Sequence, residues 1–286
     1  MGQVMGPAQV REVADELRTH REDMEIPAHV LADRLGWSPS KISRVENGLA
    51  PISEIDVVRY GAHCGMRAHE IEALLDMCRD PGAPGFWMSK RSSTLIFHET
   101  QADSSTSYNP LVVPGMLQTQ EYAAELIGDG SPWLVNLRME RQRLLSDRPF
   151  EFFIHEQALR LPVGGNRVMN EQLLKLVLVA GRPSITVRVV PSSLGARSVH
   201  GGSFVLFHYE SHKPLVYLEH GKMGFFLEDQ ECVDSFRLLR DRLGEMALSR
   251  GESREMLAAL ASEFDRPEVS PDAPEHLAEE QSQRGT

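Results

Sequence analysis

The N-terminal part of the chain repeats one pattern, in which short apolar stretches at helical spacing are separated by turn residues. Val13, Ala14 and Leu17 fall on one face of a helix predicted over 8–23. The same spacing predicts four further helices, over 27–35, 38–46, 51–64 and 67–78. Five short helices with a tight turn between the second and the third are typical of a helix-turn-helix domain, expected over residues 8–79.

The third predicted helix has two distinct faces. Ser38 is a favourable N-cap, and Pro39 stands at the first helical position, where its missing N–H costs nothing. Ile42 and Val45 face inward in this register, and no acidic residue occurs between positions 34 and 45. The outward positions hold Ser40, Lys41, Ser43 and Arg44. A short helix with an apolar back and a polar, cationic front fits the major groove of DNA.

The pattern changes after residue 79. The stretch DPGAPG predicts a linker over 80–85, and the apolar residues between 86 and 106 predict a helix. Further helices are expected after Pro114-Gly115 and over 132–145, 170–180, 231–248 and 253–264. Strands are expected over 150–155, 185–190, 203–209, 214–219 and 224–228, with a turn or strand pair over 156–161. The predicted fold class is multidomain, an all-α domain followed by an α+β domain over 86–265.

Charge limits the kind of nucleic-acid contact that the chain can make. The 286 residues carry a net charge of −11, and residues 1–79 hold nine Lys and Arg against thirteen Asp and Glu. DNA binding must therefore depend on a local cationic face, with modest non-specific affinity and a need for dimerisation. The final segment, 266–286, carries five acidic residues, two arginines and three prolines, which predicts a disordered acidic tail.

The compartment and the absence of catalytic motifs follow from composition. Cys64, Cys78 and Cys232 are widely spaced and form no CxxC pair, which favours a reducing cytoplasm and structural thiols. No apolar run reaches the roughly 18 residues of a membrane span, and the N-terminus lacks the apolar core of a signal peptide. The spacing of His208, Glu210 and His212 differs from the helical zinc motif. We expect no metal, no cofactor and no enzymatic activity.

The stretch VLADRLGWSPSKISRVENG closely resembles the Xre/phage-repressor family of helix-turn-helix domains. The resemblance covers about 60 residues. It implies a DNA-facing surface formed by Ser38, Ser40, Lys41, Ser43 and Arg44, with Lys41 and Arg44 best placed for base edges or phosphates. The other interpretation of these positions is a solvated cationic helix face.

The same resemblance concerns two further features, an ion pair at the end of the third helix and the first residues of the second helix. A glutamate at the place of Glu46 pairs in that family with an arginine late in the first helix, where Arg21 stands, so a structural ion pair is implied. Many members open the second helix with Thr-Gln, whose glutamine contacts DNA, whereas this chain has Pro27-Ala28. One usual contact is therefore missing, and His29 is either a substitute or an exposed histidine.

The second part resembles the uncharacterised C-terminal domain that follows this helix-turn-helix type in many actinobacterial regulators. The stretches VPGMLQTQEYA, HEQALRLPVGG and ALSRGESREML carry the resemblance over roughly 85–262. Such proteins are called antitoxin-like regulators of the Scr type, and a small partner protein is frequently encoded beside them. The resemblance implies a regulatory role, in which this domain dimerises and senses a partner or a ligand.

Two functions follow as expectations. The first is a sequence-specific transcriptional regulator that binds a palindromic operator in double-stranded DNA as a homodimer. The alternative is an antitoxin-like interaction protein that mainly binds a small protein from an adjacent gene. A small-molecule ligand is a further possible partner, because aromatic and Met residues of the second part either fill a core or line a pocket. The arginines of the helix predicted over 132–145, together with Arg148, either extend the DNA face, bind an acidic partner or are simply solvated.

Overall fold

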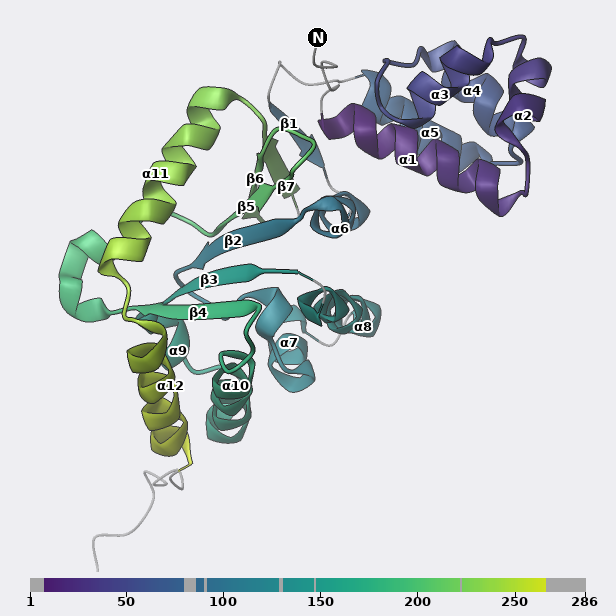
Figure 1. Ribbon diagram of the computed structural model, residues 1–286. Coiled ribbons are helices and arrows are strands. Elements are labelled where there is room, and N and C mark those ends of the chain that lie inside the picture. Colours follow the sequence, from purple (N-terminus) through teal and green to yellow (C-terminus); the bar gives the residue numbers. More distant parts are fainter. Residues whose placement is uncertain are drawn as a thin grey trace, which may run out of the picture.

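The computed structural model describes residues 8–79, 86–89, 92–128, 131–146, 148–221 and 223–265. An all-helical N-terminal domain is followed by a mixed α/β domain built on a seven-stranded sheet (Figure 1). This architecture confirms the fold class expected from the sequence. The predicted linker over 80–85 and the predicted tail over 266–286 lie outside the described residues.

The N-terminal domain packs its helices around one apolar core. Its helices are α1 (Ala8–Asp23), α2 (Ala28–Leu35), α3 (Pro39–Glu46), α4 (Glu54–His63) and α5 (Ala68–Arg79). Leu17, Leu31, Val57, Tyr60 and Leu74 are fully buried there. Each helix thus contributes its apolar face to the core, as the 3.6-residue period requires.

Helices α2, α3, α4 and α5 all begin slightly later than the sequence predicted. Pro27 is the N-cap of α2 rather than its first helical residue, and α4 begins after Ser53 rather than at Pro51. The Ser53 side chain accepts a hydrogen bond from the backbone N–H of Asp56, which fixes this start. Ile55 and Val58 are apolar residues on the outer face of α4, and Ile55 is 72% exposed.

The second domain is organised by a mixed sheet with the strand order β1-β7-β6-β5-β2-β3-β4. Its strands are β1 (Phe86–Ser89), β2 (Ser104–Asn109), β3 (Phe150–His155), β4 (Ile185–Val190), β5 (Phe204–His208), β6 (Leu215–His220) and β7 (Met223–Leu227). Strands β2, β3 and β4 run parallel, and the remaining neighbours are antiparallel. The predicted hairpin is the β5–β6 pair.

Helices cover both faces of the sheet. The α-helices are α6 (Ser92–Gln101), α7 (Gln120–Ile127), α8 (Pro132–Arg141), α9 (Glu156–Arg160), α10 (Gly165–Val179), α11 (Gln230–Met246) and α12 (Arg250–Phe264). Short 3-10 helices are η1 (Gly115–Leu117), η2 (Gln142–Ser146) and η3 (Ser192–Ser198). In Figure 1, α11 lies on one face of the sheet, and α7, α9, α10 and α12 lie on the other. Along β3, Phe150 and Phe152 join the core beneath α10 and α12, whereas Phe153 joins the core beneath α11.

Two sequence expectations for this domain were wrong. Residues 86–106 form β1, α6 and the start of β2 rather than one helix. Strand β2 has the sequence SSTSYN, and its polar residues gave no strand signal, although most of them are buried by the neighbouring strands. Residues 156–160 form the short helix α9 rather than a turn or strand pair, because the His155 side chain caps it by accepting from the Gln157 N–H at 3.0 Å.

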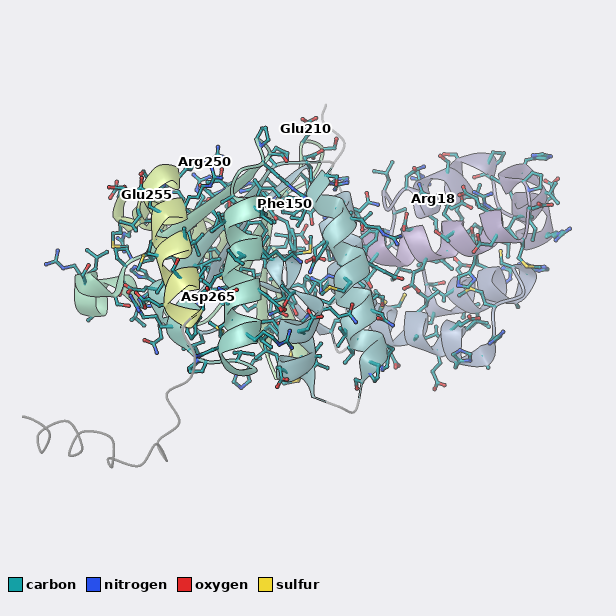
Figure 2. The ribbon with its side chains drawn as sticks, turned by 90° about the horizontal axis from the view of Figure 1, so that it is seen from below. Arg18, Phe150, Glu210, Arg250, Glu255 and Asp265 are labelled. Carbon is teal, nitrogen blue, oxygen red and sulfur yellow. The ribbon has the colours of Figure 1, made fainter. Side chains whose placement is uncertain are left out.

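The two domains meet along α1. The backbone N–H of Ala8 donates to Glu228 at 2.9 Å, and the Arg11 guanidinium lies 3.7 Å from the same carboxylate. The Thr94 hydroxyl at the start of α6 donates to the buried Glu12 carboxylate at 2.8 Å. In Figure 2, Arg18 marks the helix-turn-helix domain on one side, and Arg250 and Glu255 mark α12 on the other. Helix α1 therefore orients the recognition element relative to the second domain.

Candidate nucleic-acid interface

The turn between α2 and α3 sets the position of the candidate recognition helix. Gly36 has a φ of 68°, a left-handed conformation that glycine adopts without steric cost. The Ser38 side chain accepts from the Lys41 N–H at 3.2 Å, and Pro39 occupies the first helical turn. The Arg59 guanidinium donates to the Leu35 carbonyl at 2.7 Å. These bonds fix the angle at which α3 leaves the domain.

Helix α3 has the two faces that its sequence predicts. Ile42 and Val45 are buried in the core with Leu35 and Trp37. Of the positions that the sequence singled out, Ser38, Ser40, Ser43 and Arg44 are exposed on and beside α3. The structure thus brings four of the five sequence-predicted contact residues onto one solvent-facing surface. Asn47 donates to the Ser43 carbonyl at 2.6 Å and closes the C-terminal end of the helix.

Lys41, the fifth residue, is held within the protein. Its ammonium lies 2.8 Å from the Asp56 carboxylate of α4 and 4.0 Å from the centre of the Trp37 ring. The Lys41 ammonium therefore takes part in an ion pair and a cation–π contact at the same time. The sequence interpretation placed Lys41 beside Arg44 as a ready DNA contact, but of these two residues only Arg44 is exposed without an ion pair among the described residues.

Arg21 and Glu46 form a bidentate ion pair between α1 and α3. Arg21 Nε donates to Glu46 Oε1 at 2.7 Å, and Arg21 Nη2 donates to Oε2 at 2.8 Å. The Tyr60 hydroxyl donates to the same Oε1 at 2.7 Å, and Arg21 Nη1 reaches the Ile26 carbonyl at 2.9 Å. The ion pair that the family resemblance implied is therefore present, and α4 contributes a third member to it.

This buried cluster shifts the ionisation of its members. Hydrogen bonding to Glu46 is the main cause that raises the pKa of Arg21, so the guanidinium stays charged. Burial raises the pKa of Tyr60, and its bond to Glu46 raises the pKa further. Burial also raises the pKa of the nearby Cys64 thiol to about 11, so this cysteine is an inert core residue. The cluster is thus a structural clamp in which the Arg21 guanidinium keeps its charge at ordinary pH.

The start of α2 has no polar capping side chain. Pro27 makes no side-chain cap, and His29 is exposed without a described hydrogen bond. Arg34 near the end of α2 is also exposed. Sequence reasoning missed the roles of Asp56 and Trp37 around Lys41, because neither residue type nor spacing marks a contact between α3 and α4.

The arginines at positions 138, 141, 143 and 148 do not form the exposed face that the sequence predicted for them. Arg141 forms a two-bond pair with Glu99, at 2.7 and 2.5 Å, and Arg138 donates to Gln118 at 2.6 Å. Arg148 donates to backbone carbonyls at the end of α6, those of Glu99, Thr100 and Ala102. Because α8 packs against α6 and the sheet, these charges face inward, and of the set that the sequence singled out only Arg143 is exposed.

Metal and thiol chemistry gain no support from geometry in the described ranges. No group of three His, Cys, Asp or Glu side chains able to hold a metal ion occurs there, including around His208 and His212. The cysteines are free thiols, with Cys64 buried, Cys78 partly buried and Cys232 exposed. None of the described helices combines the length and apolar character needed to cross a membrane.

Comparisons with known proteins agree with this architecture. A helix-turn-helix domain model matches residues 12–74, and a model described as domain of unknown function DUF5753 matches residues 92–259. No curated protein matches the chain. A solved structure of TrmBL2, an archaeal chromatin protein, is similar over 63% of this chain, at 13% sequence identity and a TM-score of 0.32. The match spans 59% of that chain's length, and at this similarity it carries no weight. The DUF5753 model covers more than half of the sequence, and the chain belongs to the DUF5753 family, with a helix-turn-helix domain in front.

Proposed function

We propose that this protein is a sequence-specific DNA-binding transcriptional regulator that acts as a homodimer on a palindromic operator. In this proposal the helix-turn-helix domain is of the Xre type and contacts the major groove, and the second domain is regulatory rather than enzymatic. The observation that carries the proposal is α3 itself, with Ser40, Ser43 and Arg44 exposed on one face and Ile42 and Val45 buried on the other.

The helix-turn-helix family match and the Arg21–Glu46 clamp support this assignment. The clamp fixes the end of α3 at a buried point, so the exposed front of the helix is held rigidly. A recognition element must be rigid to discriminate base edges, because each misplaced hydrogen bond loses its contribution. Arg44 is the residue best suited to pair with guanine or a phosphate, since its guanidinium is exposed.

The test uses the full chain and a library of duplexes with a randomised 20-base-pair centre, from which bound sequences are selected. Enrichment of a two-fold symmetric motif is the expected result. Arg44→Ala should then weaken binding to the selected duplex by about 5- to 150-fold if the side chain reads a base. Arg143→Ala removes an equal charge from the second domain and should leave affinity unchanged. Selection of no motif, or equal effects of the two substitutions, would refute the proposal.

Dimerisation is proposed to use the outer face of α10. Leu174 and Leu178 lie one helical turn apart on this face and are 47% and 74% exposed. Contiguous exposed apolar patches mark protein contact sites, and these two leucines would form the centre of such a patch in a dimer. Leu178→Glu should convert a dimer to a monomer in sedimentation velocity. Leu238→Glu changes an equally apolar, exposed residue on α11 and should leave the dimer intact.

A further inference from the structure

A cavity lies in the second domain on the sheet face that α6 and α8 cover. Its volume is about 110 Å³, which is small. Strand β2 supplies Ser105, Ser107 and Asn109 to its floor, and Phe150 and Phe152 of β3 lie beside them. Figure 2 labels Phe150 on the sheet, between α12 and the helix-turn-helix domain. The cavity therefore separates the core beneath α10 and α12 from the apolar cluster beneath α6.

The floor of the cavity holds polar atoms that the protein does not satisfy. Ser107 is 5% exposed, and its hydroxyl has no hydrogen-bond partner among the described residues. The side-chain oxygen of Asn109 is likewise buried without a partner in this part of the chain. An unsatisfied buried polar group costs roughly 1–3 kcal/mol, so native proteins rarely keep one without a reason. Two of them on one wall indicate a ligand or bound water.

The wall opposite the floor carries two arginines in different electrostatic states. Arg141 is neutralised by the two-bond pair with Glu99. Arg138 donates to the neutral amide of Gln118, and no carboxylate within the described residues forms an ion pair with it. Burial and the Arg141 charge lower the pKa of Arg138, with Glu219 at the rim acting in the opposite direction. A partly buried guanidinium without a direct ion-pair partner among the described residues is a suitable site for an anion.

Gly115 of η1 lies beside this guanidinium. A Cβ atom at residue 115 would lie 3.4 Å from Arg138 Nε, an ordinary van der Waals distance, so the backbone of η1 runs close to the arginine at one side of the cavity.

The cavity opens into an apolar groove. The groove shares Arg138, Tyr217 and Glu219 with the cavity and has a volume of about 420 Å³. Its apolar wall is formed by Leu95, Ile127, Trp133, Leu134, Leu137, Met223 and Phe226. Trp133 is 61% exposed at this wall, an unusual state for the largest apolar side chain. The site thus has a small polar end and a longer apolar end.

We propose that this cavity and groove bind a small organic carboxylate with an apolar body. The carboxylate would accept hydrogen bonds from Arg138 and from the Ser107 hydroxyl, and the body would lie along the groove toward Trp133. The small inner cavity favours one carboxylate over a bulkier polyanion such as a nucleotide. One carboxylate can accept from Arg138 and from the Ser107 hydroxyl together, and the Glu219 carboxylate at the rim disfavours a ligand with more than one negative charge. The Asn109 oxygen is an acceptor and needs a donor other than the carboxylate, such as a bound water.

The position of the site links it to DNA binding, a step that rests on the proposed function. Leu95 and Glu99 on α6 line the cavity, and Thr94 on the same helix bonds to Glu12 of α1. A ligand that stabilises one position of α6 therefore biases the position of the helix-turn-helix domain. The coupling is reciprocal, so DNA must change the affinity for the carboxylate by the same factor.

The experiment measures binding of octanoate to the full chain by isothermal titration calorimetry, with phenylacetate as a second carboxylate. Saturable binding with one site per chain is expected for at least one of them. Octanamide or phenylacetamide has the same shape without the charge and should bind at least about tenfold more weakly, a difference of about 1.4 kcal/mol. Equal binding of acid and amide, or no saturable binding of either acid, would overturn the proposal.

Two variants locate the site, and thermal melting confirms that each is folded. Arg138→Gln should weaken carboxylate binding at least about tenfold, and Ser107→Val, which fills the floor, should do the same without changing charge. Arg143→Gln is the matched control outside the cavity and should bind like the unchanged chain. Full binding by both folded site variants would refute the assignment. DNA affinity is measured separately on the selected duplex, so loss of DNA recognition with retained carboxylate binding would refute only the proposed function.

Discussion

The Lys41 ammonium and the Asp56 carboxylate lie 2.8 Å apart, and this pair turns a recognition-helix cation toward its own domain. The lysine side chain is 39% exposed and the aspartate 19%, so the pair is only partly shielded from water. A pair of this kind contributes at most about 1 kcal/mol, less than a DNA phosphate can offer to the same lysine at low salt. Lys41 can therefore exchange one carboxylate for another anion.

Asp56→Asn is expected to strengthen binding to non-specific DNA, because it releases Lys41 for a phosphate contact. The slope of log K against log salt should steepen by about 0.9, the value for one added phosphate contact. Asp33→Asn removes the same charge from the exposed surface of α2 and serves as the control. The measurement is fluorescence anisotropy over a salt series. Identical slopes for the two variants would mean that only net charge matters, and Lys41→Ala should cancel the gain of Asp56→Asn.

Arg21→Met is expected to destabilise the N-terminal domain by about 3–5 kcal/mol, because it leaves the buried Glu46 carboxylate without its counterion. Tyr60→Phe removes one hydrogen bond to that carboxylate and should cost less, about 1.5–3 kcal/mol. The free energy of unfolding in urea checks both values. Arg21→Met combined with Glu46→Leu should recover part of the loss, and a double variant worse than the sum of the singles would contradict the clamp.

Stability should fall in mild acid through His98. This side chain is fully buried, and burial, with a smaller effect of the Arg11 charge, lowers its pKa from 6.5 to about 3. The unfolded chain binds a proton near pH 6.5 and the folded chain does not, so stability is complete above that pH and is lost as pH falls toward 3. The loss from this group should reach about 2 kcal/mol at pH 5. The free energy of unfolding of His98→Leu should depend less steeply on pH than that of the unchanged chain. His63→Gln replaces an exposed histidine and should show the same pH dependence as the unchanged chain.

Gly48→Ala should destabilise the helix-turn-helix domain more than Gly36→Ala. Both glycines have a positive φ, 65° and 68°, so each substitution carries backbone strain of about 1–2 kcal/mol. A Cβ at residue 48 would also lie 3.1 Å from Arg11 Cα and Cγ, whereas nothing lies within 4 Å at residue 36. The difference between the two unfolding free energies in urea measures the contact with Arg11. Equal losses of unfolding free energy in the two variants would show that α1 moves away from the added Cβ without an energetic cost.

The sequence was sufficient to predict local features of the fold, such as helix starts and alternating strands. Apolar period and capping residues located α1, α3 and β4, since Ser38, Pro39 and the alternation from Ile185 to Val190 act within a few residues. The sequence also assigned Ser40 and Arg44 to an exposed face. Arg21 and Glu46 were paired only through family resemblance, because they are 25 positions apart and no local pattern joins them.

What the sequence could not supply depends on tertiary neighbours. The polar strand β2 was missed because its burial comes from β3 and β5 rather than from its own composition. The inward turn of Arg138 and Arg141 was missed because helical spacing places charge on a face but does not say which face another element covers. The same reason applies to Lys41. Its partner, Asp56, lies on α4, and the sequence of α3 does not indicate which helix packs beside it.

The contact of α1 with Glu228 and Thr94 limits how the N-terminal domain can be exchanged between proteins by recombination. Its first helix belongs to two cores at once, since Ala8 packs with Phe207 and Phe226 of the sheet while Leu17 packs with the other helices. A recombination event that joined this domain to a foreign regulatory domain would leave the Arg11 and Glu12 side chains buried against unsuited neighbours. If the proposed function holds, DNA preference can diverge through residues 38–44, whereas the surface of α1 must change together with the domain that holds it.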